Sequence, residues 1–212
     1  MKWPRDILIP AILVGVYTAY IGLQSESTDT IYTRDVPGEI GIHERAHYNP
    51  RWSRALQSAD DLIDSGQYAA AEDIYRGILE KDPDDVETNH CLGSVLVYQS
   101  RYSEAESFYQ KALSLNPYRP NTNSGLGAVR AYLGDYEKAI EYYERAIQLD
   151  NNHSLGHLGL GENLVRIGRI ERAKYHLERV IILNPNSFLA GRAQRSLDRI
   201  NNQIEGFNEA SF

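Results

Sequence analysis

The segment GLGAVRAYLGDYEKAIEYYERAIQLD, residues 125–150, decides the fold of this chain. It contains two apolar stretches with the period of an amphipathic helix, on either side of a turn at Gly134-Asp135-Tyr136. Equivalent turns at Gly66-Gln67-Tyr68, Ser100-Arg101-Tyr102 and Gly168-Arg169-Ile170 are each 34 residues from the next. The sequence therefore predicts four helical hairpins in series.

The 34-residue spacing also holds for small and aromatic residues inside the hairpins. Small residues allow the two helices of a hairpin to cross closely, and aromatic rings fill the space between neighbouring hairpins. Because one hairpin cannot bury its own apolar face, we expect the hairpins to stack. Ser103 and Glu106 have the spacing of a capping box at the start of one second helix. The sets that share the spacing are Ala71, Ala105, Ala139 and Ala173; Ala59, Gly93, Gly127 and Gly161; Tyr68, Tyr102, Tyr136 and Ile170; and Tyr75, Tyr109, Tyr143 and Leu177.

This pattern resembles the tetratricopeptide repeat (TPR). The resemblance implies an all-α fold, a right-handed superhelical solenoid of helix-turn-helix repeats. An apolar face and an arginine-bearing face after residue 187 predict a terminal helix that caps the open end. The predicted segments are four repeats at 52–85, 86–119, 120–153 and 154–187, a capping helix at 188–205 and a tail at 206–212.

The resemblance also implies a non-catalytic scaffold whose concave groove, lined by the first helix of each repeat, holds a peptide or helix of a partner protein. For Tyr98 and Tyr132, packing between repeats is an equal alternative to partner binding. Positions that clamp a terminal carboxylate in chaperone-binding members carry no cation here, which argues against that subclass. The implied groove residues are Asp60, Asp64, His90, Ser94, Tyr98, Ala128, Tyr132, Glu162 and Arg166.

The N-terminus predicts a membrane anchor over residues 1–23, followed by a linker over 24–51. Residues 7–23 carry no charge and are long enough to approach the thickness of a hydrocarbon core. Lys2 and Arg5 precede this run, so the positive-inside rule predicts a cytoplasmic N-terminus and a repeat array on the opposite side, the periplasm in a bacterium. The alternative is a cleaved signal sequence, although no convincing cleavage site follows the run.

Ala11, Gly15 and Ala19 lie four residues apart on one face of the predicted transmembrane helix. Small residues at this spacing allow close packing, which points to a membrane-protein partner. Two further functions follow as alternatives to a scaffold. One is a permanent structural subunit of a membrane enzyme complex, docked through this helix. The other is a precursor receptor on an organelle surface.

His43-Glu44-Arg45-Ala46-His47 matches the HExxH pattern of zinc peptidases, in which two histidines hold the metal and the glutamate activates water. The motif lies in the short linker, which leaves no room for a substrate cleft, and no third ligand is evident nearby. A zinc metallopeptidase is therefore the least favoured function, and we expect neither a metal nor a cofactor. His153 and His157 are one helical turn apart but lack a ligand companion, so a structural role is favoured.

The charge of the chain restricts its partners. With 22 Lys and Arg against 29 Asp and Glu, the formal charge is −7, which argues against nucleic-acid binding. The single cysteine, Cys91, excludes an intrachain disulfide. The four predicted repeats carry formal charges of −6, 0, −2 and +2. Such a gradient could orient a charged partner or favour head-to-tail self-association.

Overall fold

The computed structural model describes residues 50–209. The predicted anchor, its Ala11, Gly15 and Ala19 face, the HExxH motif and nearly all of the linker lie outside the described residues. From residue 50 to residue 209, no helix is long and apolar enough to cross a membrane.

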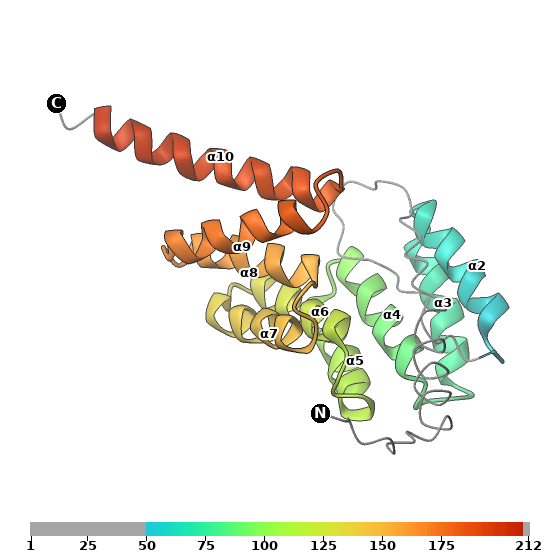
Figure 1. Ribbon diagram of the computed structural model, residues 1–212. Coiled ribbons are helices and arrows are strands. Elements are labelled where there is room, and N and C mark those ends of the chain that lie inside the picture. Colours follow the sequence, from blue (N-terminus) through green and yellow to red (C-terminus); the bar gives the residue numbers. More distant parts are fainter. Residues whose placement is uncertain (1–49, 210–212) are drawn as a thin grey trace, which may run out of the picture. The chain divides into compact units, whose positions relative to one another are not determined.

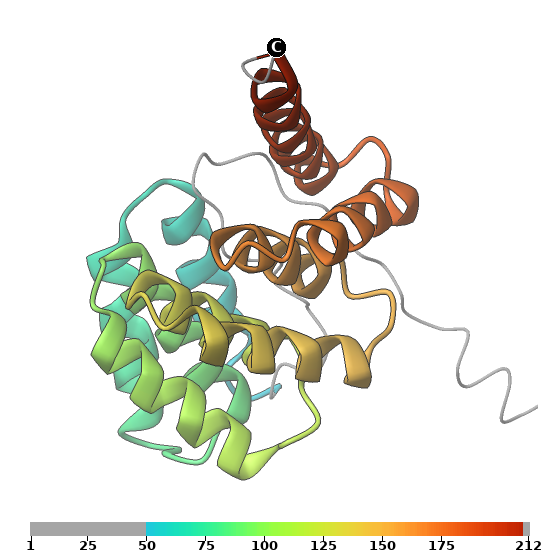
Figure 2. The same cartoon turned by 90° about the vertical axis from the view of Figure 1, so that its left-hand side faces the viewer.

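The described part of the chain is all helical and contains no strand, so the prediction of an all-α repeat fold is confirmed for it. Helices pair as α2–α3, α4–α5, α6–α7 and α8–α9, the first to fourth hairpins, and α10 follows. Figures 1 and 2 show the hairpins succeeding one another along the chain from cyan to red. The helices are α2 (Ser53–Asp64), α3 (Tyr68–Leu79), α4 (Val86–Tyr98), α5 (Tyr102–Leu115), α6 (Pro120–Tyr132), α7 (Tyr136–Leu149), α8 (Ser154–Arg166), α9 (Ile170–Leu183) and α10 (Phe188–Glu209).

The turn inside each hairpin has a residue in the left-handed region. Its φ is 75° at Gly66, 81° at Gly134 and 75° at Gly168, whereas the second hairpin uses Ser100 with φ 60°. In the first turn, the backbone N–H of Gln67 donates to the carbonyl oxygen of Leu62 at 2.8 Å, the six-to-one bond of a Schellman motif. Glycine takes this conformation without a Cβ clash, so the serine is the strained member of the series.

Tyr109 and Tyr143, which we call the central tyrosines, are each wedged between two glycines from successive first helices. A Cβ on Gly93 would lie 2.9 Å from the ring of Tyr109, and one on Gly125 would lie 2.6 Å from it. Tyr143 is held in the same way by Gly127 and by Gly159, where a Cβ would overlap the ring. The recurring glycines therefore make room for a ring from the neighbouring second helix.

The predicted capping box is wrong. Helix α5 begins at Tyr102 with Arg101 as its N-cap, so Ser103 already lies in the first turn and caps nothing. Its carbonyl oxygen accepts a hydrogen bond from the hydroxyl of Ser107 at 3.3 Å. The carboxylate of Glu106 instead pairs with Arg130 of α6, across to the next hairpin.

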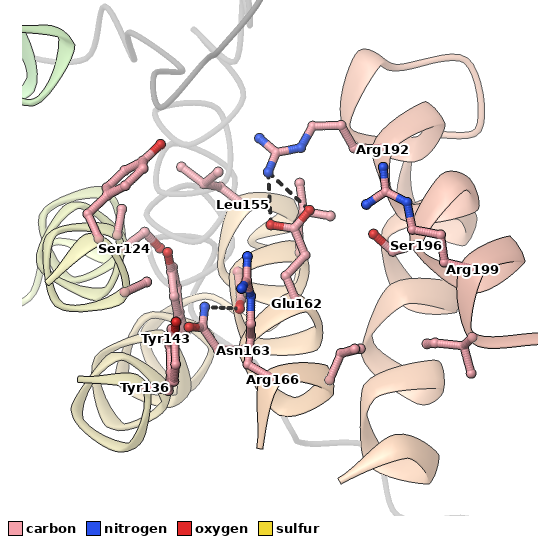
Figure 3. A pocket seen from close by; sticks show the side chains of 17 residues that line it. Ser124, Tyr136, Tyr143, Leu155, Glu162, Asn163, Arg166, Arg192, Ser196 and Arg199 are labelled. Atoms are coloured by element: carbon pink, nitrogen blue, oxygen red, sulfur yellow. Dashed lines mark hydrogen bonds and ion pairs between the residues drawn. The ribbon is translucent and has the colours of Figure 1, made fainter. Parts of the chain in front are cut away.

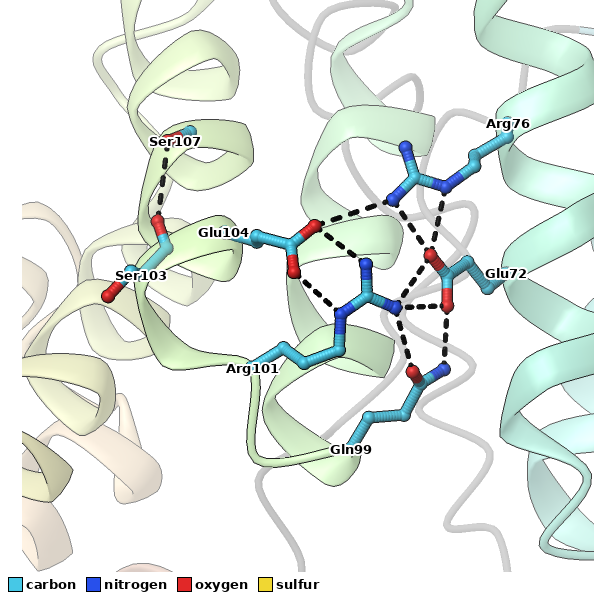
Figure 4. Close-up of polar contacts among 7 residues, drawn as sticks. All are labelled: Glu72, Arg76, Gln99, Arg101, Ser103, Glu104 and Ser107. Carbon is cyan, nitrogen blue, oxygen red and sulfur yellow. Dashed lines mark hydrogen bonds and ion pairs between the residues drawn. The ribbon is translucent and has the colours of Figure 1, made fainter.

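A polar cluster joins the first two hairpins, as Figure 4 shows. Glu72 on α3 accepts hydrogen bonds from Arg101 at 2.7 Å and from Gln99 at 2.9 Å, and Arg76 approaches the same carboxylate. Arg101 also pairs with Glu104 at 2.6 Å. Burial by itself would raise the pKa of Glu72, but the hydrogen bonds from its three donors outweigh it and lower the pKa overall.

Candidate functional site: a pocket on the first-helix face

Helices α4, α6, α8 and α10 form one continuous surface because each contacts the next, and together with α2 they make up what we call the first-helix face. The predicted groove residues lie on α2, α4, α6 and α8, but they are not equally accessible. His90 and Ser94 are buried, at 9% and 4% exposure. The Nδ1 atom of His90 is 3.1 Å from the Thr122 hydroxyl, and the Ser94 hydroxyl is 3.0 Å from that of Tyr109.

The remaining groove residues of the first two hairpins are Asp60 and Asp64 on α2 and Tyr98 on α4. Asp60 accepts a long hydrogen bond, 3.4 Å, from the hydroxyl of Tyr75. Asp64 is exposed at the last position of α2. The ring of Tyr98 stacks on that of Tyr68 with 5.0 Å between centroids and 9° between planes. This half of the face therefore uses much of its predicted groove set for packing.

The third and fourth hairpins and α10 enclose a pocket of about 510 Å³, which we call the Tyr143 pocket (Figure 3). Four of the predicted groove residues meet in it, two from α6 and two from α8. Its other polar walls come from α7 and α10. Its lining includes Ala128, Tyr132, Tyr143, Glu162, Arg166, Arg192 and Arg199.

Stacking of one side chain on another fixes part of the pocket rim. Tyr132 stacks on Tyr102 with 4.8 Å between centroids, the same arrangement as at the preceding junction. Tyr132 nevertheless remains 53% exposed, so it combines packing with an open face. At the next junction, the guanidinium carbon of Arg166 lies 5.8 Å from the ring centroid of Tyr136. A cation thus replaces the second tyrosine at this junction, and both Arg166 and Tyr136 line the pocket.

Tyr143, Arg192 and Arg199 are wall residues that lie outside the predicted groove set. Arg192 and Arg199 lie on α10, which the sequence marked only as a cap, and Tyr143 lies on a second helix. Arg192 donates to both oxygens of Glu162, at 3.0 and 2.8 Å. The signal for Tyr143 was present in the 34-residue register, since the position that carries Ser94 in the second hairpin carries Ala128 in the third.

The other reactive side chains of the described region are structural. Cys91 is fully buried, and burial raises the pKa of its thiol, which makes it a poor nucleophile. His153 is bonded through Nε2 to the Ser124 hydroxyl at 3.0 Å. The Nδ1 atoms of His157 and His176 are 3.0 Å apart. Between residues 50 and 209, no three His, Cys, Asp or Glu side chains gather as metal ligands would.

Comparison with known proteins gives the class of this array. Residues 84–152 and 118–181 each match the family model of the tetratricopeptide repeat. Residues 84–181 therefore carry TPR repeats, which typically serve as protein-interaction modules. A comparison with curated protein sequences gave no match.

Solved structures share the fold at low sequence identity. The crystal structure of MamA is 22% identical with a TM-score of 0.55, over 72% of this chain and 91% of that one. YrrB, described as a TPR protein with an unusual peptide-binding site, is 23% identical with a TM-score of 0.52, over 68% and 76%. The first TPR of Spaghetti (RPAP3), bound to the HSP90 peptide SRMEEVD, is 23% identical with a TM-score of 0.53, over 57% and 93%.

Proposed function

We propose that this chain is a non-catalytic, membrane-tethered scaffold that binds partner proteins on its first-helix face and so assembles, stabilises or recruits a multiprotein complex. The Tyr143 pocket carries the proposal. Its volume of about 510 Å³ and its mixture of apolar and charged walls suit the side chains of a bound segment. Peptide binding by YrrB and by the Spaghetti repeat is in keeping with this use of the fold.

The membrane tether is the second part of the proposal and rests on the sequence of residues 1–23. The N-terminus is placed in the cytoplasm and the repeats on the opposite side. Ala11, Gly15 and Ala19 are the proposed contact with a membrane-protein partner. Protease treatment of intact cells, with an epitope tag at the C-terminus, tests this topology. Digestion of the tag once the outer membrane is permeabilised, while the cytoplasmic membrane is still intact, supports this topology. Protection of the tag until the cytoplasmic membrane is also broken contradicts it.

Partner binding is tested by purifying the full-length chain from its host in mild detergent and identifying bound proteins by mass spectrometry. Ala128→Leu fills the pocket from a position that is 7% exposed. Ile182→Ala is the control, because Ile182 is 66% exposed on α9 and does not line the pocket. We expect Ala128→Leu to lose partners that both Ile182→Ala and a chain without residues 1–23 retain. Partners that still co-purify with Ala128→Leu, but not with the chain that lacks residues 1–23, would instead indicate a permanent membrane subunit.

A further inference from the structure

The central tyrosines differ in what their hydroxyl groups meet on the first-helix face. Tyr109 bonds to Ser94 at 3.0 Å. The residue equivalent to Ser94 in the third hairpin is Ala128, which offers no polar side-chain atom to Tyr143. Within residues 50–209, the Tyr143 hydroxyl has no hydrogen bond. Because alanine stands in the third hairpin where the second has serine, the hydroxyl of Tyr143 has no side-chain acceptor at this position.

The unused hydroxyl belongs to a side chain that is almost completely buried and lines the pocket. Tyr143 is only 5% exposed, and its ring is fixed between Gly127 and Gly159. Burial raises the pKa of Tyr143 well above its ordinary value, so the hydroxyl keeps its proton at neutral pH. The neutral hydroxyl can therefore act as a hydrogen-bond donor to a ligand. Although the ring is buried, the hydroxyl oxygen is not among the buried, unpartnered polar atoms of the described residues, so an acceptor in the pocket can reach it.

The charged side chains of the pocket favour a negative acceptor. Arg166, Arg192 and Arg199 face a single carboxylate, that of Glu162, so the lining carries a net charge of three minus one, or +2. Glu162 pairs with Arg192 alone among the three, and Arg166 lies over a tyrosine ring. Within the described residues Arg199 forms no ion pair and is exposed. Two guanidinium groups thus remain available to a ligand in positions set by the fold.

Part of the remaining lining is apolar and would contact the residues next to that acceptor. Leu155 and Leu158 contribute from α8, and Ile200 contributes from α10. A free anion would use none of this surface, whereas a peptide segment would cover it while placing a side chain inside. The pocket therefore combines recognition of a negative group with burial of aliphatic side chains.

We infer that the Tyr143 pocket binds an acidic segment of a partner protein, with a carboxylate that accepts a hydrogen bond from Tyr143 and lies beside Arg166 and Arg199. Aliphatic side chains next to that carboxylate pack on the apolar wall. This inference rests on the proposed function and adds the chemistry of the partner. The competing occupant is the first hairpin of a second copy, because that repeat carries a formal charge of −6.

A random-peptide display library, selected on the full-length chain in mild detergent, tests the inference without a chosen ligand. We expect the enriched peptides to contain Asp or Glu beside aliphatic residues. An enriched peptide is then labelled, and its affinity for each variant is measured by fluorescence anisotropy. Arg199→Glu and Arg166→Glu should each weaken binding by about tenfold or more. Arg195→Glu, which alters an exposed residue of α10 outside the pocket lining, should change it less than about twofold.

Tyr143→Phe tests the hydrogen bond from the Tyr143 hydroxyl separately from the electrostatic attraction of the arginines, because it keeps the ring and all charges. We expect it to weaken binding by about fivefold. Enriched peptides without acidic residues, or equal losses for Arg195→Glu and Arg199→Glu, would overturn the inference. Oligomers of the chain alone that Arg199→Glu disperses would overturn it in favour of a second copy. If Ala128→Leu removes native partners but the charge reversals do not, the proposed function stands and the acidic partner is wrong.

Discussion

The junction between the first two hairpins and the junction between the last two follow one plan with opposite outcomes. At the first, Glu72 is buried among three donors, and one hairpin further on Tyr109 is bonded to Ser94. At the last, Ala128 replaces the serine, the hydroxyl of Tyr143 is left over, and a pocket opens. Changes of a few side chains at equivalent positions therefore leave the first two hairpins, the closed half, tightly packed. The same changes leave the last two hairpins, the open half, with a pocket for a ligand.

The largest expected loss comes from Gly159→Ala, which tests how tightly Tyr143 is held in the open half. Because the new Cβ would overlap the ring, we expect the free energy of unfolding to fall by about 3 kcal/mol. Gly77→Ala is the matched control, since nothing lies within 4 Å of a Cβ there, and it should gain about 0.5–1 kcal/mol. Urea unfolding of the full-length chains, followed by circular dichroism, measures both. Equal behaviour of the two variants would show that the tyrosine wedge is loose.

Acid should destabilise the half that contains the fourth hairpin first. Burial lowers the pKa of His153 to about 4 from its ordinary 6.5, although Asp150 acts in the opposite direction. Between these values the unfolded chain binds more protons, so this stabilisation is complete above pH 6.5 and is lost as the pH falls towards 4. We expect a loss of about 2 kcal/mol from this residue between about pH 7.5 and pH 5. His153→Gln should flatten the pH dependence of unfolding; an unchanged slope would contradict the assignment.

Removing Glu72 from the closed half should lower the free energy of unfolding more than removing Glu162 from the open half. Glu72→Ala removes a carboxylate whose side chain is only 11% exposed and which three half-buried donors share, and it should cost about 1.5 kcal/mol. Glu162→Ala should cost about 0.5 kcal/mol or less, because its pair with Arg192 is about a third exposed and is screened by solvent. Since the pKa of Glu72 is lowered, its stabilisation persists above pH 4.5 and is lost only below that value. Equal losses in urea unfolding at neutral pH would contradict the difference between the halves.

The two tyrosine hydroxyls provide the most direct comparison. Tyr109→Phe removes the bond to Ser94 and should lower the unfolding free energy by about 1 kcal/mol. Tyr143→Phe should change it by no more than about 0.3 kcal/mol, since no bond within the described residues is lost. Thermal unfolding followed by circular dichroism resolves the two cases. A loss at Tyr143 as large as that at Tyr109 would mean that its hydroxyl already has an acceptor.

The smallest effect is expected at the turn of the second hairpin. Ser100→Gly relieves a left-handed serine, and the gain is partly offset by the greater freedom of glycine in the unfolded chain. We expect a net stabilisation of about 0.5 kcal/mol. The reverse change in the third turn, Gly134→Ser, should cost a similar amount, and differential scanning calorimetry of both variants checks the symmetry.

The sequence predicted the helical hairpins because their register is local and repeats four times. The turn at Gly134 and the tyrosine sets follow from spacing alone. The resemblance to the TPR family predicts only part of the pocket, because it assigns the groove to the first helices, whereas Tyr143 lies on a second helix and Arg199 on the terminal one. Burial of Ser94 depends on a partner fifteen residues away in a tertiary contact, which periodicity does not describe. The capping box at Ser103 failed because an N-cap depends on where the backbone enters the helix, and that point lies at Arg101.

The packing of Tyr109 between two glycines also limits which segment can be duplicated when such an array lengthens during evolution. Tyr109 belongs to the second hairpin, yet one of the two glycines that receive it, Gly125, belongs to the third. A duplicated segment that ended between them would place the ring against whatever residue opens the next first helix. An inserted repeat must therefore carry a large side chain at this position of its second helix, such as Tyr109 or Leu177, and be followed by a small residue in the next first helix. The segment that duplicates as a unit thus spans parts of two hairpins.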